Sequence, residues 1–169
     1  MILYQLNKKQ DVIGIASSDV ISATLEEQIN TAGSLKFVVA KKLSAGCQYV
    51  LIQRPGATTY MCFKILTETQ EDNKISYTAV ESAYDELGSY SYIKDMRPQN
   101  RTAKEMLQQI LSATRFSVGY VADTGTQSTN FYYTTVLASL QSVVNLFNLE
   151  VTFDVVFDPI DNQVNRRLV

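Results

Sequence analysis

The sequence predicts a β-rich α+β fold, with an antiparallel β-barrel-like domain followed by a smaller α+β domain with two helices. Residues 2–80 contain short segments in which apolar and polar residues alternate between turn sequences, as in an antiparallel sheet. Residues 102–147 contain two segments with apolar residues at helical spacing. Hydrophobic residues make up 46% of the 169 residues, which is ordinary for a globular protein with a sizeable core.

The first half of the chain alternates between strands and turns. Arg54-Pro55-Gly56 and Glu71-Asp72-Asn73 are turn sequences, since proline fixes φ and Asp and Asn tolerate a left-handed backbone. Regular strands joined by short turns indicate an antiparallel sheet that can close into a barrel. The expected strands are residues 2–6, 12–16, 21–29, 35–39, 48–53, 60–67 and 75–80.

The character of the sequence changes near Glu81. Ser82–Leu87 is expected to form about one helical turn, with Gly88 as its C-cap. The following residues, 89–100, are polar and rich in tyrosine. We therefore expect a boundary between a domain of residues 1–88 and one of residues 89–169.

A capping box begins the next helix. In Thr102-Ala103-Lys104-Glu105, the Thr hydroxyl and the Glu carboxylate can each accept a bond from a free amide at the helix start. The helix should run to about Ala113, with an apolar face that includes Met106 and Leu107. Phe116–Ala122 then alternates as a strand before the turn Asp123-Thr124-Gly125.

Residues 131–157 are the segment around which the second half is organised. A helix over residues 136–147 is expected, with Thr135 as its N-cap. From Leu149 to Phe157 the period changes to two, which predicts a strand with one apolar face. We expect this unit to pack against the Thr102 helix. A turn at residues 158–162 and a return strand at 163–169 should follow. Since the chain stops within that strand, we expect it to be a fragment of a longer polypeptide.

Composition excludes several classes of function. The net charge is −2, so no global field favours nucleic acid, a membrane surface or an acidic substrate. The chain has no histidine, which excludes catalytic triads that use one. Cys47 and Cys62 lie in apolar runs and are interpreted as buried small side chains rather than as a disulfide or a metal site. There is no secretory signal at the N-terminus and no apolar run of membrane-spanning length.

No motif predicts catalysis. The acidic residues are scattered and are interpreted as solvated turns and strand edges rather than as a glycosidase pair. Asp158 and Asp161 are too sparse for a calcium loop, and no Gly-rich phosphate loop is present. Arg166-Arg167 is interpreted as a strand-edge device against aggregation. The acidic groups considered are Glu26-Glu27, Glu71-Asp72, Asp85-Glu86, Asp158 and Asp161.

Ten tyrosines stand out in a chain without tryptophan. The pairs Tyr90/Tyr92 and Tyr132/Tyr133 could form a surface that stacks on sugars or binds a protein. In an alternating strand, however, one tyrosine of each pair would lie in the core, and this second interpretation is favoured from the sequence.

Four stretches in a fixed order carry a resemblance to a known family. Together they resemble the N-terminal hub region of phage tail proteins of the prophage endopeptidase tail family, also called tail-associated lysin or minor structural protein. The pattern extends nearly from end to end, but none of the stretches is a catalytic motif. Where many members carry a histidine-containing version, this chain has YTAVESAYDEL. The stretches are VISATLEEQINTAGSLKFVV, YTAVESAYDELGSY, NRTAKEMLQQILSATRFSVGYVADTG and NFYYTTVLASLQSVVNLFNLEVTFD.

The resemblance implies a role in assembly. Such a segment is similar to the baseplate hub of contractile tails, a trimer whose tail-tube-like β-barrels close the tube until DNA is released. Its implied partners are two further copies, the distal tail protein and, as a further candidate, the tape measure protein. DNA would pass through the channel without sequence-specific binding. The implied location is the virion tail tip, after synthesis in the bacterial cytoplasm.

The leading prediction for residues 1–169 is therefore a structural protein with no catalytic, cofactor-binding or metal-binding residues. Lytic or receptor-binding domains would lie C-terminal to it. Two alternatives remain open, a cell-wall endopeptidase and a carbohydrate-binding module that uses the tyrosine pairs.

Overall fold

The computed structural model describes residues 1–89, 92–158 and 163–168. The chain forms two compact units. We call the first the sheet unit, which consists of residues 1–82 and a return segment that begins at Asp154. The second is the helical unit, which consists of residues 83–153 and a short segment that begins at Arg166.

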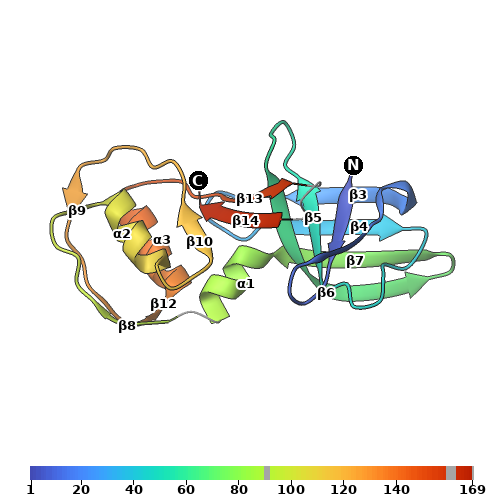
Figure 1. The fold of residues 1–169 in the computed structure, drawn as a ribbon, viewed down its shortest axis with the longest axis horizontal. Helices are drawn as coiled ribbons and strands as arrows, with labels where there is room; N and C mark the ends of the chain where they lie inside the picture. Colours follow the sequence, from blue (N-terminus) through green and yellow to red (C-terminus); the bar gives the residue numbers. More distant parts are fainter. Residues whose placement is uncertain (90–91, 159–162, 169) are drawn as a thin grey trace. The chain divides into compact units, whose positions relative to one another are not determined.

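The sheet unit is built from antiparallel strands around one long central strand (Figure 1). Its strands from residues 1–82 are β1 (Leu3–Leu6), β2 (Val12–Ile15), β3 (Val20–Glu26), β4 (Ser34–Val39), β5 (Tyr49–Gln53), β6 (Tyr60–Glu71) and β7 (Lys74–Glu81). The first half of β6, Tyr60–Lys64, pairs with β5. From Phe63 to Glu71 the strand pairs with β7, with a register shift between Ile65 and Thr67. From β5 the sheet continues to β1 and β2, and from β7 it continues to β4 and β3.

These pairings confirm the antiparallel sheet, although most strands differ from the expected bounds by a few residues. The expected turns are also present, with Gly56 at φ 74° and Asp72 at φ 48°. In the described part of the chain, β2 pairs with β1 alone and β3 pairs with β4 alone. β2 and β3 are therefore edge strands as described, and closure of the sheet into a barrel is not confirmed.

Apolar and polar residues alternate along these strands, and the apolar side chains on the inward face form the core of the sheet unit. Leu35, Val39, Phe63 and Ala79 are fully buried, and the rings of Phe37 and Tyr77 stack at a centroid distance of 5.1 Å. Each large side chain buried in this way contributes about 1.5–3 kcal/mol to folding. The hydrophobic pattern thus fixes which face of each strand is inside.

The strand β13 (Phe153–Asp158) brings the chain back to the sheet unit, where Val155 lies opposite Tyr60 of β6. Phe157 makes edge-to-face contacts with Tyr4 and Tyr60, at centroid distances of 4.8 and 5.4 Å. The prediction of one strand from Leu149 was wrong, because the strand begins only at Phe153. The alternating residues are buried as expected, but they are divided between two cores: Val151 and Phe153 in the helical unit, Val155 and Phe157 in the sheet unit.

The helical unit packs α2 and α3 against short strands (Figure 1). Its apolar core joins Met106 and Leu107 of α2 to Leu140 and Val143 of α3, which confirms the expected packing of these two helices. Its helices are α1 (Ser82–Ser89), α2 (Ala103–Leu111) and α3 (Val136–Leu146). Its strands are β8 (Tyr92–Met96), β9 (Arg101–Thr102), β10 (Phe116–Val118), β11 (Thr126–Gln127) and β12 (Phe131–Thr135).

Both helix starts are as predicted. Thr102 Oγ1 accepts a bond from the amide of Glu105 at 3.3 Å, and Glu105 Oε2 accepts one from the amide of Thr102 at 2.9 Å. At α3, the hydroxyl of Thr135 accepts a bond from the amide of Ala138 at 3.1 Å. These bonds satisfy donors that the first helical turn would otherwise leave free.

Three local predictions for this unit were wrong. Gly88 is not a C-cap, because α1 continues to Ser89. A Cβ at Gly88 would lie 3.3 Å from Cδ2 of Leu137, so close packing, rather than a left-handed backbone, favours glycine there. The polar stretch after Gly88 contains the unpredicted strand β8, and the strand expected over residues 116–122 ends at Val118.

The predicted return strand is present as β14 (Gln163–Leu168), which lies between β13 and β10 in the strand order. Its pairing with β10 is parallel, with Phe116 opposite Arg166. Part of the turn expected before it, residues 159–162, lies outside the described residues.

We expect Thr102→Ala to lower the free energy of unfolding by about 1 kcal/mol, because it removes the side-chain acceptor of the α2 capping box. Urea denaturation followed by circular dichroism measures this change. The control is Gln108→Ala on the exposed face of α2, which should change stability by less than about 0.5 kcal/mol. Equal stability of the Thr102→Ala variant and the wild-type chain would contradict the role of the cap.

Candidate functional site

Three exposed tyrosines gather on the ribbon formed by β8 and β12. We call Tyr92, Tyr132 and Tyr133 the tyrosine surface; their exposed fractions are 57%, 67% and 58%. The rings of Tyr132 and Tyr133 meet edge to face at a centroid distance of 4.5 Å, and those of Tyr92 and Tyr133 lie 6.2 Å apart. The prediction that one tyrosine of the 132/133 pair is core was therefore wrong. Tyr90 lies outside the described residues.

The backbone conformation of Tyr133 explains why the alternating pattern of the sequence did not predict its exposure. Phe131 is buried opposite Met96, so strict alternation would turn Tyr133 towards the same side. Tyr133 instead has φ 45°, in the left-handed region. The register of the ribbon is the same before and after this residue. A bulky residue rarely adopts such a φ, which costs about 1–2 kcal/mol and is commonest at functional sites.

A pair of charged groups lies beside the tyrosine surface, at its Tyr132 end. Asp95 is directly opposite Tyr132 in the ribbon. Its carboxylate accepts two bonds from the guanidinium of Arg97, at 2.9 and 3.1 Å. A bidentate pair of this kind fixes both planar groups, so the tyrosine surface carries oriented polar edges beside its rings.

A groove adjoins the tyrosine surface at Tyr92. Its volume is about 400 Å³, within the range of about 300–1,000 Å³ of small-molecule sites. It combines apolar side chains with a carboxylate, an amide and a hydroxyl. We call it the tyrosine groove; its lining residues are Tyr92, Ile93, Asp95, Met96, Gln109, Ile110, Ser112, Ala113 and Val136.

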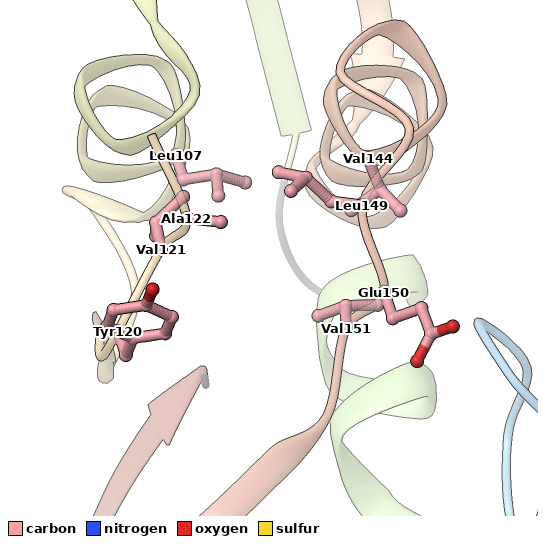
Figure 2. Close-up of a pocket in the computed structure, with 8 residues that line it drawn as sticks. All are labelled: Leu107, Tyr120, Val121, Ala122, Val144, Leu149, Glu150 and Val151. Carbon is pink, nitrogen blue, oxygen red and sulfur yellow. The ribbon is translucent and has the colours of Figure 1, made fainter. Parts of the chain in front are cut away.

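A second pocket, of about 190 Å³, is lined almost entirely by apolar groups. Figure 2 shows Leu107, Val121 and Ala122 on one side of it and Val144 and Leu149 on the other. The carboxylate of Glu150, which also lines this pocket, points away from the cavity (Figure 2). This pocket has no convergent polar groups that could orient a ligand or take part in a reaction.

Arg54 in the sheet unit joins residues that are distant in sequence. Its Nε donates to Asp154 at 2.9 Å and a terminal nitrogen donates to Glu27 at 2.6 Å. Both bonds raise the pKa of the guanidinium against the opposing effect of burial. The sequence placed Asp154 on the polar face of its strand, but it is 9% exposed. No signal in the sequence marks it, because its partner lies 100 residues away.

Glu81, at the end of β7, is 7% exposed. Its Oε2 accepts a bond from the amide of Gly33 at 3.1 Å. Burial raises the pKa of Glu81 to about 7, although the Gly33 bond and the nearby charge of Arg54 act in the opposite direction. The sequence gave no reason to single out this carboxyl group.

Glu26, Glu27, Glu71 and Asp72 are exposed, as predicted. The prediction was wrong for Asp85 and Glu86, which are part-buried on helix α1. Glu26 pairs with Lys36 at 3.7 Å, and Glu86 pairs with Arg115 at 2.7 Å. Asp161 lies outside the described residues, as do the side chains of Asp158 and Arg166-Arg167. The proposed edge role of the two arginines stays a prediction.

The two cysteines are free thiols. Cys62 is buried, and burial raises the pKa of Cys47 to about 11. Because a thiolate is the reactive form, Cys47 is poorly suited to act as a nucleophile near neutral pH. Within the described residues, no three His, Cys, Asp or Glu side chains are grouped as a metal site. In the same part of the chain, no helix has the length and hydropathy needed to cross a membrane.

The comparisons with known proteins agree with the resemblance inferred from the sequence. Residues 91–166 match the model of the prophage endopeptidase tail domain. The fold is similar to that of prophage tail protein gp18 from Listeria monocytogenes, with a TM-score of 0.62 and 12% identity, over 99% of this chain and 50% of that one. A tail protein from Neisseria meningitidis gives a TM-score of 0.49 and 14% identity, over 89% of this chain and 45% of that one.

The chain thus spans about half the length of gp18. A search of curated proteins found no match. At 12% identity the likeness to gp18 shows the fold alone.

We expect the stability of the chain to fall as the pH rises from about 4.5 to about 7. In this range the folded state holds a proton on Glu81 that the unfolded chain releases, so unfolding is favoured by rising pH. The change should be on the order of 3 kcal/mol. Glu81→Gln should remove most of it, as measured by urea denaturation at pH 5 and pH 8.

Glu71→Gln is the control for this experiment, since Glu71 is an exposed acid of the same unit. It should retain the pH dependence of the wild-type chain. If Glu81→Gln retained it as well, the buried carboxyl group would not be its source.

We expect Tyr133→Gly to raise the free energy of unfolding by up to about 1 kcal/mol, because glycine adopts a positive φ without strain. Tyr132→Gly is the matched comparison in the same strand and should lower it by about 0.5–1 kcal/mol. Thermal unfolding of both variants tests the difference in sign. Destabilisation of equal size would show that Tyr133 is not strained.

Proposed function

We propose that this chain is a structural component of a phage or prophage tail tip, in the position of a baseplate hub. The match of residues 91–166 to the prophage endopeptidase tail domain carries this proposal. The fold shared with gp18 over 99% of the chain supports it. In this role the protein closes the tail tube and connects the distal tail protein to C-terminal lytic or receptor-binding domains.

The sheet unit offers the means of assembly. β2 and β3 each have one described partner strand, so each has a free edge for another chain. Both edges are apolar at exposed positions, since Ile15 is 60% exposed and Ile21 is 50% exposed. Pairing of the β2 edge of one copy with the β3 edge of the next is a head-to-tail contact, which closes into a ring if the rotation allows. We propose a homotrimer of this kind.

The proposed ring binds the distal tail protein, with the tape measure protein as a further candidate partner. DNA passes through the channel without sequence-specific contacts, and the net charge of −2 suits a passage that does not retain it. We keep the division expected from the sequence, with residues 1–88 as the hub domain and residues 89–169 as the adjoining α+β domain. The proposed location is the virion tail, after synthesis in the bacterial cytoplasm.

We propose no catalytic role for residues 1–169. The chain lacks histidine, and Arg54 binds two of the carboxylates that lie close together in the sheet unit. The endopeptidase named in the family description would then belong to another domain. A turbidity assay on bacterial cell walls should show no clearing by this chain, and clearing would favour the endopeptidase alternative.

We expect the protein, co-expressed with the distal tail protein, to form a complex that contains three copies of this chain. Ile15→Lys should abolish it, because a charge on the β2 edge opposes strand pairing. Size-exclusion chromatography with light scattering measures the stoichiometry. Leu66→Lys is the control, since Leu66 is 57% exposed but lies in the central strand.

A stable monomer without affinity for the distal tail protein would contradict the proposed hub. Equal loss of the complex in both lysine variants would instead show that the β2 edge is not the specific contact.

A further inference from the structure

The tyrosine surface and the tyrosine groove together have the chemistry of a sugar-binding site. We propose that they bind an uncharged oligosaccharide. This inference concerns the helical unit alone and does not depend on the proposed hub, whose contacts lie on the β2 and β3 edges.

The rings are placed for stacking. One face of a pyranose ring carries C–H groups and packs well on an aromatic face, while the phenol hydroxyl remains in water. The ring planes of Tyr132 and Tyr133 differ by 88°, and those of Tyr92 and Tyr133 by 55°. The edge-to-face contact of Tyr132 and Tyr133 covers one face of one ring, but each of the three side chains is more than half exposed, so the other ring faces are open to a ligand.

The groove supplies partners for sugar hydroxyls. Asp95 and Gln109 line it with a carboxylate and an exposed amide, and Ser112 adds a hydroxyl. Ile93 and Ile110 lie among them and provide apolar contact. A few oriented polar groups on an otherwise apolar wall are typical of small-molecule sites.

The pairing of Asp95 with Arg97 favours an uncharged sugar over a charged ligand at this end of the surface. The Asp95 carboxylate is neutralised by its two bonds with Arg97, at 2.9 and 3.1 Å. The pair therefore attracts neither anions nor cations strongly, but its planar groups still accept and donate hydrogen bonds at fixed positions.

Burial of the Asp95–Arg97 pair under a protein partner would remove both charged groups from water, which is costly. Asp95 lies directly opposite Tyr132, at one end of the tyrosine surface. Tyr133 keeps its left-handed backbone although its side chain stays 58% exposed, so burial of the ring within the chain offsets little of the strain. Contact with a ligand would give this strained conformation a function.

The test is binding of the 169-residue chain to a glycan array of neutral bacterial polysaccharides and N-acetylglucosamine oligomers, followed by calorimetry with the best oligomer. We expect Tyr132→Leu to weaken binding at least tenfold and Tyr132→Phe to retain it, because stacking needs the ring but not the hydroxyl. Tyr133→Ala should weaken it similarly. Tyr120→Ala is the control, since Tyr120 is 78% exposed and lies outside both the surface and the groove.

Thermal unfolding of each variant shows whether it is folded. Comparison of folded Tyr132→Leu with folded Tyr132→Phe then shows the effect of removing the aromatic ring alone. Absence of binding to every glycan by the folded wild-type chain would overturn the proposal. Binding that survives Tyr132→Leu and Tyr133→Ala would overturn it as well. Loss of a tail-protein complex in these variants, without any glycan binding, would assign the surface to a protein partner instead.

Discussion

The ion pair between Arg54 and Asp154 is the constraint on which the sheet unit depends. Asp154 is the first residue of the returning chain in this unit, and its carboxylate is 2.9 Å from Arg54 Nε. Only one residue later, Val155 pairs with Tyr60 of β6, and Phe157 then packs on Tyr4. Since removal of Arg54 would leave the buried Asp154 carboxylate without its counterion, the pair favours this position of β13 in the sheet.

Because the chain returns to the sheet unit at Asp154, the alternating apolar residues on either side of this position are divided between two cores. Val151 and Phe153 are buried with α2 and α3, whereas Val155 and Phe157 are buried with Tyr4 and Tyr60. Each core is therefore completed by a neighbouring part of the same short segment. The capped helices give the helical unit a core of its own, and its β8–β12 ribbon is left with exposed aromatic rings.

The two proposals use different parts of the molecule. Assembly uses the strand edges β2 and β3, where backbone groups and exposed isoleucines are available to another chain. Ligand binding uses three tyrosines and the groove beside them. Neither role requires a catalytic group.

The sequence by itself determined the features that depend on neighbours along the chain. These include the capping box at Thr102, the N-cap at Thr135, the turns at Gly56 and Asp72, and the alternation of the strands, because each rests on contacts a few residues apart. Only the tertiary structure decided the burial of Glu81 and Asp154 and the outward position of Tyr133. The first two depend on Gly33 and Arg54, 48 and 100 residues away. The third depends on a backbone angle that alternation cannot predict, since a single residue at positive φ turns its side chain without changing the register of the strand.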